Sequence, residues 1–227
     1  METLYAAPTV NPVLECALKD DLQALKMLFE DAPEPGKGRA TDLLLKKDLM
    51  GRNVLFPACI LGRCEIVKEL IKYGANLNSR TSRGYSLLHC AAAWGQLDML
   101  KTLIELDANV KACNFCNEKA YEIAVRYNKT ECADFLAWAE AKLELKMYIS
   151  FVQQSFTDLE KTQGKLNKEY KHQTMAACKY KNDWLEHTKN PTTHDFVEQK
   201  QQLEAIMQTI LSKLNTTPDS GKYTSKS

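Results

Sequence analysis

The chain repeats itself at a fixed interval of 33 residues, and this period constrains its fold more than any other feature. When the segment that begins at Gly51 is laid over the segment that begins at Gly84, identical residues fall together. The coinciding pairs are Gly51 and Gly84, Leu55 and Leu88, Ala58 and Ala91, Gly62 and Gly95, Ala75 and Ala108, and Asn76 and Asn109. A period of this length is typical of a helix–turn–helix unit that buries its apolar face only by stacking on a neighbouring copy.

The second copy carries the more complete motif. Its characteristic residues are Gly84, Leu88-His89, Ala91-Ala92 and Gly95. This pattern resembles the ankyrin repeat, and the resemblance implies a stack of α-helical hairpins joined by exposed turns. In that family the histidine, here His89, bonds to backbone groups and holds neighbouring turns together. The resemblance therefore implies structural roles for Gly51, Gly62, Gly84, His89 and Gly95.

Two degenerate copies flank the clear ones. Residues 11–30 match the repeat at an offset of 42, so nine extra residues separate this copy from the next. The segment 31–40 contains two prolines and two glycines, and we expect it to form an exposed loop that accommodates the excess. In the last copy, residues 117–139, Asn117 and Asn128 take the places of turn glycines, since asparagine tolerates positive φ. The sequence thus predicts about four units, enough for a stable stack.

The C-terminal part of the chain predicts long helices. No glycine or proline occurs from Glu131 to Gln163, and apolar residues recur there every three or four positions. The outer helix of the last repeat should therefore continue for about 30 residues and end at Gly164. Further helices are predicted at about residues 166–187 and after Pro191. The predicted domains are an ankyrin stack over residues 1–140, a three-helix bundle over residues 141–215 and a disordered tail over residues 216–227.

The predicted bundle carries a second resemblance. It rests on scattered positions that include Leu145, Trp184-Leu185, Phe196, Leu203-Glu204 and Ile210. Residues 141–215 resemble the C-terminal helical lid of the 70-kilodalton heat-shock chaperones. In that family the lid closes over a peptide-binding β-domain, and the sequence shows neither that domain nor a nucleotide-binding domain. The resemblance therefore implies a fold for this region and no ATP-driven activity.

Charge and composition argue against several classes of partner. The chain has 30 lysines and arginines against 29 aspartates and glutamates, and neither half shows the basic stripe that nucleic acids require. No apolar run reaches the roughly 18 residues needed to span a bilayer, and Met1 to Val10 does not resemble a secretory signal. The eight cysteines should then stay reduced. We expect a cytoplasmic protein, with the nucleus or a cytoskeletal structure as alternative locations.

Residues that could carry chemistry lack the partners that chemistry needs. Cys113 and Cys116 have the spacing of half a zinc site, without a second pair of ligands at a suitable distance. A metal site and a labile redox pair stay open for them, but two ordinary loop cysteines are the favoured interpretation. His89 has no nucleophile or orienting partner in its repeat, and Gly36-Lys37-Gly38 lacks the context of a phosphate-binding loop. We therefore expect no enzyme, no cofactor, no metal and no small-molecule substrate.

The ankyrin resemblance instead implies a surface for protein partners. In that family the loop tips and inner helices form a concave face, and the repeat register places Arg52, Arg83, Tyr85 and Trp94 on or near it. Tryptophan, tyrosine and arginine are enriched among residues that dominate binding energy. For Trp94 the alternative is packing against the next repeat. The sequence predicts a non-enzymatic adaptor or scaffold; a co-chaperone-like module that uses the bundle and a structural subunit of a cytoskeletal assembly are the alternatives.

Overall fold

The computed structural model describes residues 11–31, 36–163 and 168–216. Within these ranges the regular structure is helical, apart from one isolated bridge between Arg80 and Ser86, which confirms the all-α prediction. The chain divides into two compact units, Met1–Ala139 and Glu140–Ser227.

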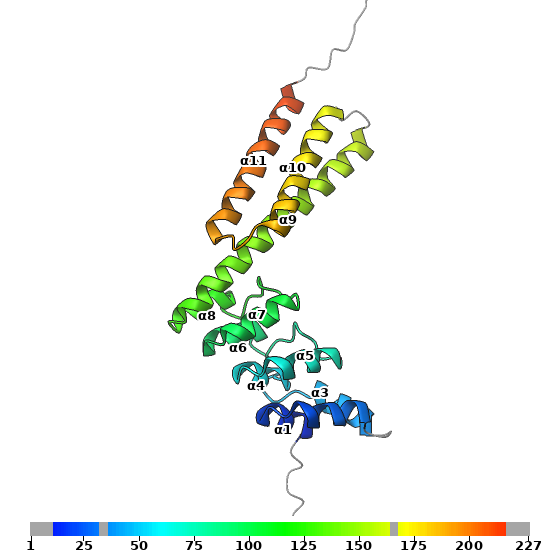
Figure 1. Ribbon diagram of the computed structural model, residues 1–227, viewed down its shortest axis with the longest axis vertical. Coiled ribbons are helices and arrows are strands. Elements are labelled where there is room, and N and C mark those ends of the chain that lie inside the picture. Colours follow the sequence, from blue (N-terminus) through cyan, green and yellow to red (C-terminus); the bar gives the residue numbers. More distant parts are fainter. Residues whose placement is uncertain (1–10, 32–35, 164–167, 217–227) are drawn as a thin grey trace, which may run out of the picture. The chain divides into compact units, whose positions relative to one another are not determined.

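The first unit is a stack of helical hairpins (Figure 1). Its inner helices are α1 (Pro12–Lys19), α4 (Leu55–Ile60), α6 (Leu87–Trp94) and α8 (Ala120–Arg126). Its outer helices are α2 (Leu22–Lys26) with the π-helix η1 (Met27–Asp31), α5 (Cys64–Lys72), α7 (Leu97–Glu105) and the beginning of α9 (Thr130–Gln163). Helix α1 contacts α4, α4 contacts α6 and α6 contacts α8, while α2 contacts α5 and α5 contacts α7. Inner helices therefore pack on inner helices and outer helices on outer helices, as the repeat predicts.

Left-handed backbone conformations recur with the repeat. The turns between inner and outer helices place Asp20, Gly62, Gly95 and Asn128 at φ values of 61°, 70°, 71° and 54°. The hairpin tips place Gly51, Gly84 and Asn117 at 77°, 75° and 60°. The prediction that asparagine preserves these turns is confirmed. At Gly51 a side chain would also meet the next tip, since an added Cβ would lie 2.8 Å from the backbone nitrogen of Ser82.

The segment between the first two repeats of the stack differs from its prediction. We expected residues 31–40 to form a loop, but helix α3 (Gly36–Leu45) begins inside that segment; residues 32–35 lie outside the described ranges. Ala40 and Leu44 of α3 are buried, and α3 contacts both α1 and η1. Burial of this apolar face outweighs the poor helix propensity of glycine near the start of the helix. Leu44 thus re-enters the stack as expected, whereas Leu45 is exposed.

The second unit contains the remainder of α9, together with α10 (Lys168–His187) and α11 (Thr193–Thr216). The prediction of one continuous helix is confirmed, since α9 has 34 residues. Helices α10 and α11 contact each other, and the buried apolar side chains of this unit are Leu145, Ile149, Val152, Phe156, Cys178, Phe196, Leu203, Met207 and Ile210. Gly164, the side chains of Leu159 and Leu214, and the predicted tail from residue 217 onward lie outside the described parts of the chain.

Two side chains of α9 that lie off its predicted apolar stripe behave differently. Ile149 is buried, whereas Phe151 is 64% exposed and lies close to Tyr148, with 6.2 Å between the ring centroids. Met147, four residues before Phe151 on the same helix, is also exposed. Trp184 and Leu185, which we expected in the core of the bundle, are only half-buried, although the Trp184 ring packs edge-on against buried Phe196.

Candidate protein-interaction surface

Successive hairpin tips of the first unit are joined by the same backbone hydrogen bond. The Ser82 N–H donates to the carbonyl of Met50 at 2.9 Å, and the Phe115 N–H donates to the carbonyl of Arg83 at 3.0 Å. Both donor positions and both acceptor positions are separated by one repeat period. These bonds hold the tips in register, so that equivalent residues of neighbouring repeats lie side by side.

His89 links two hairpins. Its Nδ1 accepts a hydrogen bond from the Ser86 N–H at 3.1 Å, with the Ser86 hydroxyl 2.7 Å away, so its Nε2 donates to the carbonyl of Glu118 at 2.9 Å. The side chain is 1% exposed. Burial, and to a smaller extent the charge of Arg80, lowers the pKa of His89 to about 4. The imidazole is therefore neutral near pH 7, in the single tautomer that these two backbone contacts require.

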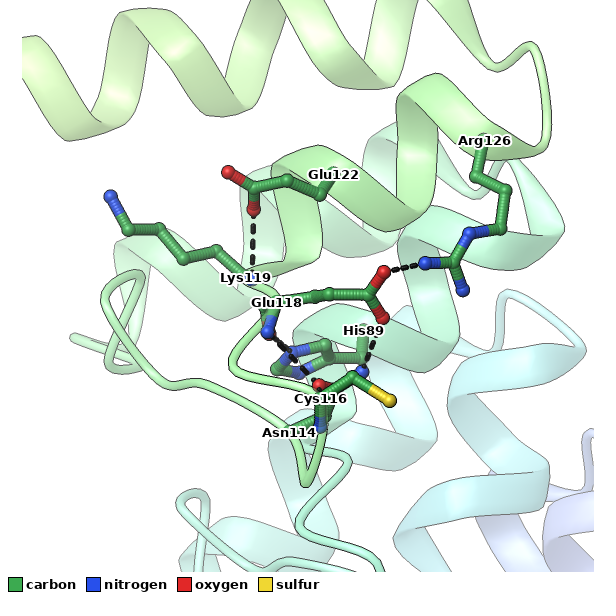
Figure 2. Close-up of polar contacts among 7 residues, drawn as sticks. All are labelled: His89, Asn114, Cys116, Glu118, Lys119, Glu122 and Arg126. Atoms are coloured by element: carbon green, nitrogen blue, oxygen red, sulfur yellow. Dashed lines mark hydrogen bonds and ion pairs between the residues drawn. The ribbon is translucent and has the colours of Figure 1, made fainter.

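In the last repeat Glu122 takes the place of the histidine and accepts a hydrogen bond from the Lys119 N–H at 2.8 Å. Figure 2 shows the neighbouring tip, where Glu118 lies between Asn114 and Arg126. The Asn114 amide donates to Glu118 at 2.9 Å, and Arg126 forms an ion pair with the other carboxylate oxygen. The Asn114 side-chain oxygen also accepts the N–H groups of Cys116 and Glu118. The Glu122 side chain thus replaces the histidine as a cap of its own helix, and Asn117 replaces the turn glycine by adopting a positive φ.

The inner helices present a stripe of exposed apolar side chains. Leu61, Trp94 and Tyr127 are 43%, 61% and 56% exposed, and each is one repeat period from the next. They stand immediately before the left-handed turn residues Gly62, Gly95 and Asn128. We call Leu61, Trp94 and Tyr127 the inner stripe. Its regular spacing follows from the repeat, and the side chain of Trp94 is exposed to solvent rather than packed against the next repeat.

The hairpin tips add a second cluster, which consists of the exposed residues Arg83 and Phe115 and half-buried Tyr85. The guanidinium of Arg83 lies 5.7 Å from the centroid of the Phe115 ring, and the Tyr85 ring lies 6.2 Å from the same ring. Tyr85 also meets the edge of His89 at 5.7 Å. Phe115 is 62% exposed, so this tip cluster offers two aromatic rings and a cation to an approaching protein.

Arg52 occupies the same repeat position as Tyr85 but has a different environment. Its Nε and its backbone N–H both donate to the carboxylate of Asp48, each at 2.8 Å. Hydrogen bonds from the Arg52 backbone, and then from the side chain of Arg52 and the Met50 N–H, lower the pKa of Asp48. Arg52 is exposed, but its charge is largely balanced within its own tip.

The structure therefore brings Arg83 and Tyr85 together around Phe115, whereas Arg52 lies in the preceding tip and Trp94 at the end of α6. That all four contact a partner stays a prediction. Sequence reasoning missed Leu61, Tyr127 and Phe115. The signal for the first two was available, because both lie one period from Trp94. Phe115 lies one period from Ser82, a polar residue, so the repeat gave no reason to single it out.

The cysteines of the Cys113–Cys116 pair are free, one half-buried and one exposed, and the Cys113 thiol lies 3.6 Å from the carbonyl of Lys111. Among the described residues, the one grouping of three potential metal-ligand side chains is His194, Asp195 and Glu198 in the second unit. Asp195 there caps its own helix by accepting the Thr192 N–H at 2.7 Å. No helix in the described part of the chain combines the length and apolarity needed to cross a bilayer.

Comparison with known proteins identifies the repeats and several relatives of this chain. A family model described as ankyrin repeats in three copies matches residues 13–114. Ankyrin repeat domain-containing protein 45 of Danio rerio is 48% identical over 215 residues, which cover 94% of this chain and 96% of that protein. The Homo sapiens protein of the same name is 48% identical over 206 residues, covering 91% of this chain and 77% of its own length.

The stacked hairpins and the matched repeats define an ankyrin-repeat protein. These matches indicate no catalytic family. Given the identity and coverage of its relatives, the chain belongs to the ankyrin repeat domain-containing protein 45 family. The resemblance of residues 141–215 to a chaperone lid stays a prediction.

Proposed function

We propose that this chain is a non-enzymatic adaptor that binds a protein partner through the inner-helix side of its ankyrin stack. The binding surface consists of the inner stripe, Leu61, Trp94 and Tyr127, and the tip cluster, Arg83, Tyr85 and Phe115. It corresponds to the concave face by which ankyrin repeats generally bind proteins. The hydrogen-bonded tips hold this surface in a preformed arrangement, so binding requires little ordering of the chain.

The observation that carries the proposal is the exposure of large side chains at repeated positions. Trp94, Tyr127 and Phe115 are each more than half exposed, although aromatic side chains are among the most favourable to bury. Exposed apolar side chains that cluster on one face mark interaction sites, whereas scattered ones need no explanation. Tryptophan, tyrosine and arginine are also the residues that most often dominate binding energy.

A paired-variant experiment tests this proposal. The tagged chain is expressed in cells that naturally produce an ankyrin repeat domain-containing protein 45, so that its partners should be present. Partners are identified by quantitative mass spectrometry after mild crosslinking. Replacing both Trp94 and Tyr85 with alanine should lower partner recovery about tenfold or more, since one such residue contributes about 2 kcal/mol or more to a typical interface. Trp94 is exposed and Tyr85 is half-buried, so circular dichroism of the variant must first show that it remains folded.

The matched control replaces Met147 and Phe151 with alanine. These side chains are also large and apolar and are 52% and 64% exposed, but they lie in the second unit. The proposal expects this control to recover partners as the wild type does. Full recovery by the Trp94 and Tyr85 variant, with loss in the Met147 and Phe151 variant, would move partner binding to the helical unit.

A further inference from the structure

A groove lies between the first two inner helices of the stack, beside the hairpin tip that contains Gly51 and follows helix α3. Its volume is about 410 Å³, within the usual range for ligand pockets. The side chains and backbone that line it come from α1, from the turn after α3 and from α4. They include Leu14, Leu18, Lys46, Lys47, Pro57 and Ile60.

We call the apolar residues of α1 and α4 that line the groove its floor. Leu18 of α1 is 46% exposed, and Ile60 of α4 is half-buried. The two residues are 42 positions apart, which is the offset between the first two copies, so they occupy equivalent places on neighbouring inner helices. Leu14 and Pro57 complete the floor. The groove therefore offers an apolar side chain a place to be buried, at about 25 cal/mol for each Å² removed from water.

The rim of the groove is positively charged. Its one lining carboxylate, Asp48, already accepts hydrogen bonds from Arg52 and from the Met50 N–H, and these bonds lower the pKa of Asp48. Lys46 and Lys47 are exposed and, within the described residues, form no ion pair. Two cations without a carboxylate thus stand beside an apolar floor.

We propose that this groove binds an apolar side chain of a partner polypeptide that has aspartate or glutamate beside it. This inference rests on the proposed function. It names the kind of partner segment that the groove between α1 and α4 would recognise. The apolar side chain would occupy the floor formed by Leu18 and Ile60. Its acidic neighbours would reach Lys46 and Lys47, which supply attraction at the rim and select against basic segments.

The chemistry of the groove favours a peptide of this kind over a nucleic acid. A phosphate backbone would match the lysines but would leave the floor between Leu18 and Ile60 unfilled, and no extended basic stripe continues from the groove. A basic or uncharged apolar segment would match the floor but not the rim. An acidic and apolar segment satisfies both.

A phage-displayed library of random twelve-residue peptides tests the inference on the full-length chain. Peptides selected on the wild type should be enriched in an aliphatic or aromatic residue flanked by aspartate or glutamate. The double variant Lys46→Glu, Lys47→Glu should bind the selected peptides at least tenfold more weakly, as measured by fluorescence anisotropy. The same charge change at two exposed lysines of the second unit, Lys146→Glu and Lys179→Glu, should leave binding unchanged.

The outcomes separate this inference from the proposed function. Selected peptides without acidic residues, or equal binding by the Lys46 and Lys47 variant, would overturn the inference. If binding by those peptides nevertheless falls in the Trp94 and Tyr85 variant, the proposed function stands without it. Tighter peptide binding by a chain that lacks residues 2–10 would assign the groove to that segment and overturn the claim of an external partner.

Discussion

The first and the last junction of the ankyrin stack are held together in different ways. At the last junction, buried His89 joins Ser86 to the carbonyl of Glu118, and a backbone bond links Phe115 to Arg83. The first junction relies on side chains. Its polar contacts include Arg63 with Asp20 at 3.2 Å, the Tyr73 hydroxyl with Glu30 at 2.7 Å, Lys26 with Glu69 at 4.0 Å, Lys72 with Glu30 at 3.9 Å, and the Asn11 amide with the carbonyl of Leu43 at 3.0 Å.

This difference explains where the groove lies. In the clear repeats each hairpin tip hydrogen-bonds to the tip before it, whereas the Gly51 tip, at the first junction, follows directly after helix α3. Because exposed ion pairs contribute only about 0–1 kcal/mol, the first junction depends mainly on apolar packing. A junction of this kind can leave a gap between inner helices without losing an obligatory hydrogen bond.

The largest loss of stability should come from a change at Phe56, which is fully buried. In the second repeat of the stack, Phe56 occupies the position that His89 has in the third. Replacing Phe56 with alanine should lower the free energy of unfolding by about 4 kcal/mol, because a cavity replaces a ring. Urea denaturation measures this loss. Phe115→Ala is the control, since Phe115 is 62% exposed and its loss should change stability by no more than about 1 kcal/mol. Equal losses in both variants would show that the first junction does not depend on the packing of Phe56.

The next effect should come from His89. Replacing it with alanine leaves the Ser86 N–H and the Glu118 carbonyl without their partner, which should lower the unfolding free energy by about 3 kcal/mol. Thermal melting followed by circular dichroism provides the measurement. His172→Ala, at an exposed position, serves as the comparison and should be neutral. A melting temperature unchanged by His89→Ala would contradict the role assigned to this side chain.

The same histidine predicts a pH dependence. Its folded-state pKa of about 4 lies below the ordinary value of 6.5, so protonation favours the unfolded chain. The stabilisation is complete above about pH 6.5 and is lost as pH falls toward 4, with a slope of up to about 1.4 kcal/mol per pH unit. Urea titrations at several pH values should show this slope in the wild type and a shallower one in His89→Gln. Parallel curves for the two proteins would refute the shifted pKa.

The smallest effect should come from Tyr73, at the first junction. Its hydroxyl donates to Glu30, and its ring stacks on Phe29 with 4.3 Å between centroids. Replacing Tyr73 with phenylalanine keeps the stacking and removes the hydrogen bond, so the loss should be about 1 kcal/mol or less. Hydrogen exchange should show faster opening of residues 22–31, with residues 87–105 unaffected. A loss as large as that of His89→Ala would erase the contrast between the two junctions.

The contrast between the two junctions also shows which parts of the fold could be predicted from the sequence. The turns were predictable because positions 62, 95 and 128 each require a left-handed backbone, which few residue types besides glycine and asparagine tolerate. Helix α3 was not, because glycines indicate a loop and only the burial of Leu44 reverses that preference. The repeat left two environments open for Trp94, contact with a partner or packing against the next repeat, and the structure shows its side chain exposed. The groove beside Lys46 depends on how α3 packs, and no local pattern encodes that packing.

The central claim is that the inner-helix side of the stack contacts a partner protein, and photo-crosslinking in cells tests it most directly. A benzophenone-bearing phenylalanine is placed at position 94, on the inner stripe, or at position 68, an exposed site on outer helix α5. We expect a discrete protein adduct from position 94 that is absent from position 68. The same adducts from both positions, or an adduct from position 68 alone, would contradict it.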